Sequence, residues 1–284
     1  MHPSQGRSSA RAFDPQALAR WLVQAHAQRE TFTRAPQAIR ARTAQEATAA
    51  QQAFVRLKSA QCGPTVGWKI ALSTPVMQKM VGLAQPVAGR LHQKQIVQSP
   101  AQTHLSSYTR LIVEFEIAVV LRRDLQQGPL AHTAASVRSA VGWIAPAMEL
   151  ADDRLASYPH MHDKGLELTA DNAWNEGVIR GEQKTLASIL PNASPLGADD
   201  PLANLAGQVW RNGEPIGQGT GRDLMGHPLE ALAWLANAAH LRGESLKQGE
   251  LCILGSLVSS QFPKAGDRFE YKLGEFAPIA LQID

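Results

Sequence analysis

The sequence predicts an α+β protein of 284 residues, with an N-terminal helical segment followed by a longer, strand-rich part. Residues 14–60 carry helix caps and helical spacing, whereas the strands expected later do not alternate regularly with helices. Hydrophobic residues make up 44% and charged residues 19%, which is typical of a globular protein with a sizeable core. We therefore expect a helical segment over residues 1–65 and a β-rich domain over residues 66–284.

Two helices are expected in the N-terminal segment. Asp14 is a suitable N-cap, and Pro15 suits the first helical position that follows it. Thr43 and Glu46 have the spacing of a capping box before an Ala/Gln-rich body. Gly63 and Pro64 then end the second helix.

Strands and short helices are expected in the middle of the chain. TVGWKIAL (65–72) predicts a strand, and Thr74 and Pro75 after it predict a helix start. RLIVEFEIAVVL (110–121) predicts a buried strand, because apolar residues dominate both of its faces. A helix over residues 131–141 and a strand-like segment over 142–154 are expected to follow.

In the chain after residue 155, turn residues separate the expected strands and helices. Asn212–Gly213 between two short runs is the strongest hairpin signal in the chain. The other expected elements are an irregular polar stretch over 155–175, a strand at 178–183, a surface loop at 191–201, a helix over 227–246 and short strands over 250–284.

Composition limits the classes of function. A net charge of +3 with 6% aromatic residues gives no basis for nucleic-acid binding. The two cysteines, Cys62 and Cys252, form no paired motif, which fits a reducing compartment. No apolar run approaches the roughly 18–20 residues that span a bilayer, and the first residues lack the apolar core of a signal peptide. The expected location is cytoplasmic, with no membrane partner.

Glu114 and Glu116 lie two residues apart on the predicted buried strand. Side chains alternate between the faces of a strand, so both acids point the same way, about 7 Å apart. Burying two such carboxylates is costly without a compensating cation. Two alternatives need no metal ion: the strand lies half-exposed at a sheet edge, or Arg or Lys side chains pair with the two acids. Glu149, in AMELADDRL, would complete an all-oxygen site for Mg²⁺ or Mn²⁺.

Three further residues suggest site chemistry. Lys69 lies inside a predicted strand, where burial or a nearby cation would depress its pKa toward the range useful in acid–base catalysis. A lysine whose charged end reaches solvent is the alternative. Asp171 and Asn172, in TADNAW, would hydrogen-bond a substrate or form an Asx turn.

Two other motifs favour structural roles. GQGTGRDLMGHP is rich in glycine but lacks a Walker lysine and the strand–helix context of a nucleotide site, so it predicts a turn before a helix. His160 and His162 have a spacing that is common by chance in polar loops, and His227 is expected at a helix entry.

The ordered set GWKIAL, VEFEIAVVLRRDL, AMELADDRL, TADNAW and RNGEPIGQGTGRDLMGHPLEALAWLAN resembles one branch of the fumarylacetoacetate hydrolase superfamily. This branch contains the 2-keto-4-pentenoate hydratases and the 4-oxalocrotonate decarboxylases. The resemblance extends from about Ala47 to the C-terminus. It implies a mixed β-roll or sandwich core with a divalent metal site, preceded here by N-terminal helices, and homo-oligomers.

The resemblance also implies roles for single residues. Glu114, Glu116 and Glu149 match the metal-binding glutamates. Lys69 and Asp171 match catalytic residues, and Asn172 and Arg154 match residues expected to bind substrate. Trp174 and Ser73 are also expected to bind substrate, although both depart from the family pattern. Trp174 stands where relatives have serine, and Val87 replaces an acid in QPVAG, which would weaken a hydratase assignment by removing a proton-transfer group.

The resemblance implies a metal-dependent lyase in a meta-cleavage-type catabolic pathway. It would act on a 2-oxo or 2-hydroxydienoate acid by hydration or by decarboxylation, two reactions that use the same electron sink. An acylpyruvate-type C–C hydrolase and a non-catalytic metal-binding relative with an altered pocket are the alternatives. A complex with a companion pathway enzyme would be compatible with either lyase activity.

Overall fold

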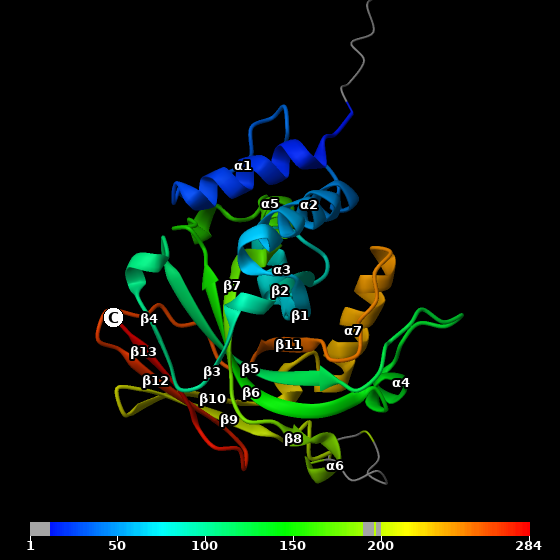
Figure 1. Cartoon of the computed structure of the whole chain (residues 1–284), viewed down its shortest axis with the longest axis vertical. Coiled ribbons are helices and arrows are strands. Elements are labelled where there is room, and N and C mark those ends of the chain that lie inside the picture. The colour runs from blue at the N-terminus through cyan, green and yellow to red at the C-terminus, as the bar shows by residue number, and fades with distance from the viewer. Residues whose placement is uncertain (1–11, 190–195, 197–199) are drawn as a thin grey trace, which may run out of the picture.

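The computed structural model describes residues 12–189, 196 and 200–284. It confirms the predicted α+β architecture, with two β-sheets and helices that gather mainly at one end and one side (Figure 1). The helices are α1 (Pro15–Ala27), α2 (Ala44–Cys62), α3 (Pro75–Val81), α4 (Ala134–Arg138), α5 (Gly165–Ala170), α6 (Leu186–Ile189) and α7 (Pro228–Leu241).

The larger sheet carries the predicted buried strand at its centre. Its strand order is β2-β1-β11-β5-β6-β7-β3, with the short β8 paired to β6. The bounds are β1 (Thr65–Ala71), β2 (Val87–His92), β3 (Ile96–Gln98), β5 (Leu111–Leu121), β6 (Val141–Asp152), β7 (Asn175–Arg180), β8 (Lys184–Thr185) and β11 (Leu251–Ser256).

The smaller sheet has the order β10-β9-β12-β13-β4. The predicted hairpin is confirmed, because β9 and β10 pair on either side of Asn212 and Gly213, whose φ angles are 55° and 85°. The bounds are β4 (Ala101–Thr103), β9 (Ala206–Arg211), β10 (Glu214–Thr220), β12 (Arg268–Leu273) and β13 (Ile279–Ile283).

The two N-terminal helices begin where their caps predict. The Asp14 side chain accepts a hydrogen bond from the backbone N–H of Gln16, and Thr43 accepts one from that of Glu46. The capping box is only half formed, since the Glu46 carboxylate accepts instead from the backbone N–H of Arg42. α2 ends at Cys62 and β1 begins at Thr65, but the domain boundary near residue 65 stays a prediction.

The main hydrophobic core lies on one face of β5. Odd-numbered residues from Leu111 to Leu121 are buried in it, together with residues of α7 and of β12 and β13. Even-numbered residues of the same strand face a different environment, where Ala118 and Val120 pack in a second cluster. Alternation along β5 therefore separates a purely apolar face from the face that bears Glu114 and Glu116.

Some expectations about the elements were incomplete. The stretch 155–175, expected to be irregular, contains α5, whose Gly165, Leu168 and Ala170 are buried. The helix expected over 131–141 is shortened to α4, and β2, β3 and β4 were not foreseen because they are short or lack clear alternation. Most of the surface loop expected at 191–201, and the polar N-terminal residues up to 11, lie outside the described residues.

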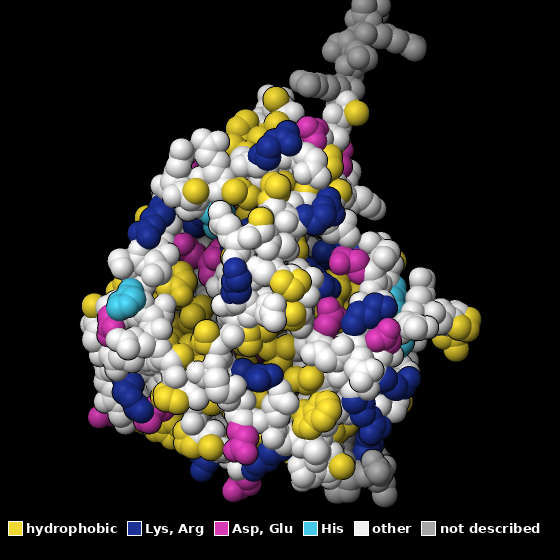
Figure 2. Space-filling view, in the orientation of Figure 1, with side chains coloured by type: hydrophobic (Ala, Val, Ile, Leu, Met, Phe, Trp, Pro, Cys, Tyr) yellow, Lys and Arg dark blue, Asp and Glu magenta, His cyan; other side chains and the backbone are white. Residues whose placement is uncertain are grey.

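The surface is mixed in charge. Basic and acidic side chains alternate across the face seen in Figure 2 and form no single basic stripe there. Among the described residues, none of the helices combines the length and the apolarity that a membrane crossing needs.

Candidate metal centre and active-site cavity

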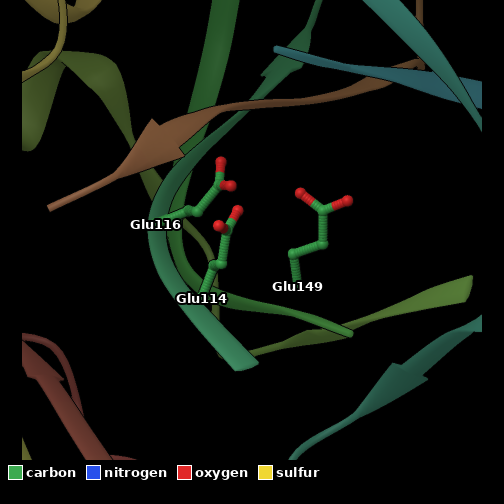
Figure 3. A group of neighbouring side chains, drawn as sticks. All are labelled: Glu114, Glu116 and Glu149. Carbon is green, nitrogen blue, oxygen red and sulfur yellow. The ribbon is translucent and has the colours of Figure 1, made fainter. Parts of the chain in front are cut away.

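Three carboxylates converge on the polar side of the central strand pair. Glu114 and Glu149 are direct partners across the antiparallel β5–β6 ladder, and Glu116 lies two residues further along β5 on the same face. One carboxylate oxygen of each lies within 4.8 Å of the others. Figure 3 shows the three side chains extending from neighbouring strands to the same side.

Each glutamate has one oxygen held by the protein. Ser260 donates to Glu114 Oε1 over 2.5 Å, the Gly255 N–H donates to Glu116 Oε2 over 2.6 Å, and Asn175 donates to Glu149 Oε1 over 2.8 Å.

The remaining oxygens of the two most buried glutamates lack partners. Glu116 Oε1 and Glu149 Oε2 are inaccessible to solvent and accept no hydrogen bond among the described residues. Unpaired buried carboxylate oxygens are costly, and an all-oxygen donor set suits a hard dication such as Mg²⁺ or Mn²⁺. The residues present therefore fit such an ion.

The electrostatics of the site agree with that fit. Burial and the charges of Glu149 and Glu114 raise the pKa of Glu116 well above its usual value. Burial likewise raises the pKa of Glu149. Without a counter-ion, the fold therefore disfavours the charged form of both groups.

Lys69 lies beside the triad on β1. Its Nζ is 2.9 Å from Glu149 Oε1 and donates to the Ala173 carbonyl over 3.2 Å. The expectation of a depressed pKa is wrong for the chain without a metal ion. Burial does lower the pKa of Lys69, but the negative charges of the three glutamates outweigh it and raise the pKa. The alternative of a lysine reaching solvent is excluded, since the side chain is 2% exposed.

A cavity of about 480 Å³ opens over these groups. Lys69, Glu114 and Gly255 form its polar end, and two predicted substrate-binding residues, Ser73 and Trp174, also lie in its wall. The wall further includes Leu72, Met77, Met80, Ile112, Tyr158, Leu168, Asp223, Leu257, Val258 and several serines.

The segment before Trp174 is wound in an uncommon conformation. Asn172, Ala173 and Trp174 all have positive φ angles, between 48° and 64°. The Asn172 amide accepts from the Arg90 N–H and donates to the Arg90 carbonyl, at 2.8 and 2.9 Å. Asn172 therefore clamps the segment to β2, and this clamp holds the Ala173 carbonyl against Lys69. Its substrate-binding role stays a prediction.

Asp171 and Arg154 do not line the cavity. They form a buried ion pair with each other, and His26 Nε2 from α1 lies 2.5 Å from Asp171 Oδ1. His26 Nδ1 lies 3.2 Å from Glu176, which Lys58 also contacts at 2.7 Å. This chain of charges, from Arg154 through Asp171, His26 and Glu176 to Lys58, ties the N-terminal helices to the site loop. A catalytic role for Asp171 stays a prediction.

The chain of charges predicts a pH-dependent stability. Burial lowers the pKa of His26, but Asp171 and Glu176 outweigh it and raise the pKa from 6.5 to about 9. A raised folded-state pKa means that the contribution is full below pH 6.5 and is lost as the pH rises through 9. We expect His26→Gln to cost roughly 3 kcal/mol of unfolding free energy at pH 6, and much less at pH 10. Urea denaturation of both proteins at the two pH values measures this, and an equal cost at both would contradict it.

Val87 packs in a hydrophobic cluster with Ile112, Leu168 and Trp174, three residues that line the metal-site cavity. It is buried and lies in the wall of a second cavity, of about 630 Å³, between α2, α7 and the start of β2. The effect of the missing carboxylate on a hydratase assignment stays a prediction.

Several site residues escaped the sequence reasoning. Asn175 and Ser260 are ordinary polar residues, and only the fold brings them to the glutamates. Gly255 left a signal, since a glycine inside an apolar strand indicates a bulge or a close backbone approach. Its φ of 110° and the register shift between Ile253 and Ser256 aim its N–H at Glu116.

Comparisons with known proteins agree with this geometry. The family model described as "Fumarylacetoacetate (FAA) hydrolase C-terminal" matches residues 74–284. The chain belongs to this family. A 2-hydroxyhexa-2,4-dienoate hydratase of Comamonas testosteroni is 33% identical over 232 residues, covering 81% of this chain and 82% of that protein. A 2-keto-4-pentenoate hydratase of Paraburkholderia xenovorans is 33% identical over 219 residues, with coverage of 77% and 76%.

A solved structure has the same fold as this protein over nearly the full length of both chains. The 4-oxalocrotonate decarboxylase from Pseudomonas putida G7, complexed with magnesium and adipate, superposes with a TM-score of 0.83. It is 23% identical, and the match covers 95% of this chain and 97% of that one. The predicted superfamily branch, fold and lyase-type enzyme are thereby confirmed.

Proposed function

We propose that this family member is a divalent-metal-dependent lyase acting on a 2-oxo or 2-hydroxydienoate acid, with hydration as its reaction. The observation that carries the proposal is the pair of buried, unpartnered oxygens on Glu116 and Glu149, which converge with Glu114 beside Lys69 at one end of a cavity. The hydratases at 33% identity support hydration over decarboxylation.

Glu114, Glu116 and Glu149 would hold Mg²⁺ or Mn²⁺. When bound, such an ion supplies Lewis acidity toward the carboxylate and 2-oxo oxygens of the substrate. The protein contributes orientation, because Ser260, Gly255 and Asn175 each fix one glutamate oxygen.

Lys69 is the group best placed to move a proton. Its Nζ lies at the junction of the carboxylates and the cavity, and the Ala173 carbonyl and Glu149 fix its position. Hydration of a dienoate needs a proton delivered to carbon and a water molecule added to the conjugated ketone. The protonated amine of Lys69 is the proposed proton donor, and it also attracts the substrate carboxylate.

Decarboxylation is the second candidate, because it proceeds through a similar dienolate. A turnover assay separates the two. The protein with Mg²⁺ is mixed with a 2-hydroxydienoate and, separately, with a 2-oxo-enedioate. We expect metal-dependent loss of the dienoate ultraviolet absorbance without release of CO₂. Release of CO₂ from the enedioate would favour decarboxylation, and no turnover of either would favour a C–C hydrolase or a non-catalytic relative.

Gly89 provides a test of the position of Lys69. A Cβ atom at Gly89 would lie 2.8 Å from Lys69 Cγ and 3.2 Å from the Asn172 carbonyl oxygen. We expect Gly89→Ala to displace the lysine and to lower kcat between about tenfold and a hundredfold.

Mg²⁺ affinity, measured by calorimetry, is expected to change little in this variant. The matched control is Gly128→Ala, where a Cβ would meet only a carbonyl oxygen at 3.9 Å. Wild-type kcat in Gly89→Ala would argue against a role for Lys69 in catalysis.

A further inference from the structure

We propose that the metal-site cavity selects a 2-oxo or 2-hydroxydienoate monocarboxylic acid whose far end is uncharged and apolar, and that it discriminates against acids with a second carboxylate. This inference rests on the proposed function and narrows its substrate class.

The cavity wall carries one cation. Among the described residues that form it, Lys69 is the only Lys, Arg or His, and it lies at the metal-binding end. The acids in the wall are Glu114, at the same end, and Asp223. A substrate bound by its 2-oxo acid group would therefore use the single cation, and no cation of the wall would remain to pair with a second carboxylate.

Two arginines that lie near cavity-lining residues in the sequence, Arg110 and Arg154, are already paired with aspartates. Arg110 donates two hydrogen bonds from Nε to Asp153, at 2.7 and 3.0 Å, and Arg154 is paired with Asp171. Withdrawing either cation would leave a buried aspartate without its partner, at a cost that a distal carboxylate would have to offset. Lys79 lies on α3 but is not part of the wall.

Apart from six residues with hydroxyl groups, the rest of the wall is apolar. Met77 and Met80 of α3, Leu168 of α5 and Trp174 contribute to it. The indole Nε1 of Trp174 is inaccessible and has no hydrogen-bond partner among the described residues, so the ring offers carbon to the cavity. The Phe32 ring packs edge-on against this indole, with centroids 5.1 Å apart, which holds it in place. Such a wall favours an alkyl or aryl group over a charged one.

The size of the cavity agrees with an extended tail. Ligand pockets commonly measure roughly 300 to 1,000 Å³, and this one, at about 480 Å³, has room beyond a 2-oxo acid head for several carbons. Methionine side chains adapt to apolar groups of different shapes, so tails of more than one length are expected to fit.

Calorimetric titration of the Mg²⁺-loaded protein tests the inference without turnover. The probes are oxalate, 2-oxobutanoate, 2-oxohexanoate and 2-oxohexanedioate. We expect 2-oxohexanoate to bind roughly tenfold or more tightly than 2-oxohexanedioate, which has the same length but a second carboxylate. From 2-oxobutanoate to 2-oxohexanoate, the affinity is expected to rise about fourfold per methylene. Equal or tighter binding of the diacid would overturn the inference.

Variants of α3 test whether the cavity wall causes the preference for monoacids over diacids. Met77 is 37% exposed, and arginine has a similar helix propensity, so Met77→Arg is expected to fold. It should tighten binding of the diacid about tenfold, while the neutral Met77→Gln should not. Lys79→Ala is expected to leave the mono-to-diacid ratio unchanged. A selective loss of monoacid binding there, or no response of the diacid to Met77→Arg, would contradict the proposed wall.

Oxalate separates this inference from the proposed function. Oxalate has the two-oxygen head and no tail, so it tests the metal centre alone. Mg²⁺-dependent oxalate binding combined with a preference for the diacid would overturn the inference and leave the proposed function standing. Oxalate binding that does not depend on Mg²⁺ would overturn both.

Discussion

Glu116→Gln is expected to abolish Mg²⁺-dependent turnover while the fold is retained. Residues that only orient a metal ligand typically contribute 10- to 100-fold, so loss of a ligand should lower affinity and kcat/KM by more than about a hundredfold. The free energy of unfolding without metal is expected to rise, because burial and two neighbouring carboxylates disfavour a charge at Glu116. Calorimetry with Mg²⁺ and urea denaturation in a chelator measure the two effects.

The matched control for Glu116→Gln is Glu182→Gln, which removes the same charge from an exposed position. It should change neither Mg²⁺ affinity nor stability appreciably. Unchanged Mg²⁺ affinity in Glu116→Gln would show that the three glutamates are not the metal centre. A large loss of stability without metal would show instead that the carboxylate is a structural partner.

Asp171→Ala is expected to destabilise the protein by about 3–5 kcal/mol, the usual cost of leaving a buried charge unpaired. The Asp171 carboxylate is fully buried between Arg154, which is 1% exposed, and His26. Two cations would lose their common partner. Urea denaturation at pH 7 measures the cost, and the His26→Gln single and double variants show how much of it depends on the histidine.

Asp163→Ala is the control for Asp171→Ala. Its ion pair with Arg34 is 41% exposed on both sides, and such pairs contribute less than about 1 kcal/mol. Because the Asp171 carboxylate lies outside the cavity wall, the pH profile of kcat in folded Asp171→Asn is expected to keep its shape. Loss of one limb of that profile would show that Asp171 transfers a proton.

The sequence predicted best the features that depend on neighbours along the chain. The caps at Asp14 and Thr43 and the Asn212–Gly213 hairpin rest on contacts over a few residues, and the long buried strand was predicted from its local run of apolar side chains. The alternation of side chains was also enough to place Glu114 and Glu116 on one face. Glu149 and Lys69 were singled out from their own segments, and the resemblance then matched both to family residues.

Contacts between distant residues could not be predicted in the same way. Asp171 was expected at the substrate, yet its partner His26 lies 145 residues away, in a helix whose own pattern says nothing about a carboxylate. The pKa of Lys69 was expected to fall with burial. Its pKa is raised instead, because three acids surround the amine. The distances between the amine and these acids depend on strand register.

The sequence by itself determined where the two N-terminal helices begin, where the β9–β10 hairpin turns and that two acids share one face of β5, because backbone periodicity, capping and turn chemistry act locally. Only the tertiary structure decided that Glu149 lies opposite Glu114, that Gly255 and Ser260 hold the carboxylates, and that Met80, Leu168 and Trp174 line the same cavity. These contacts join segments up to 146 residues apart, and no local rule sets the register in which they meet.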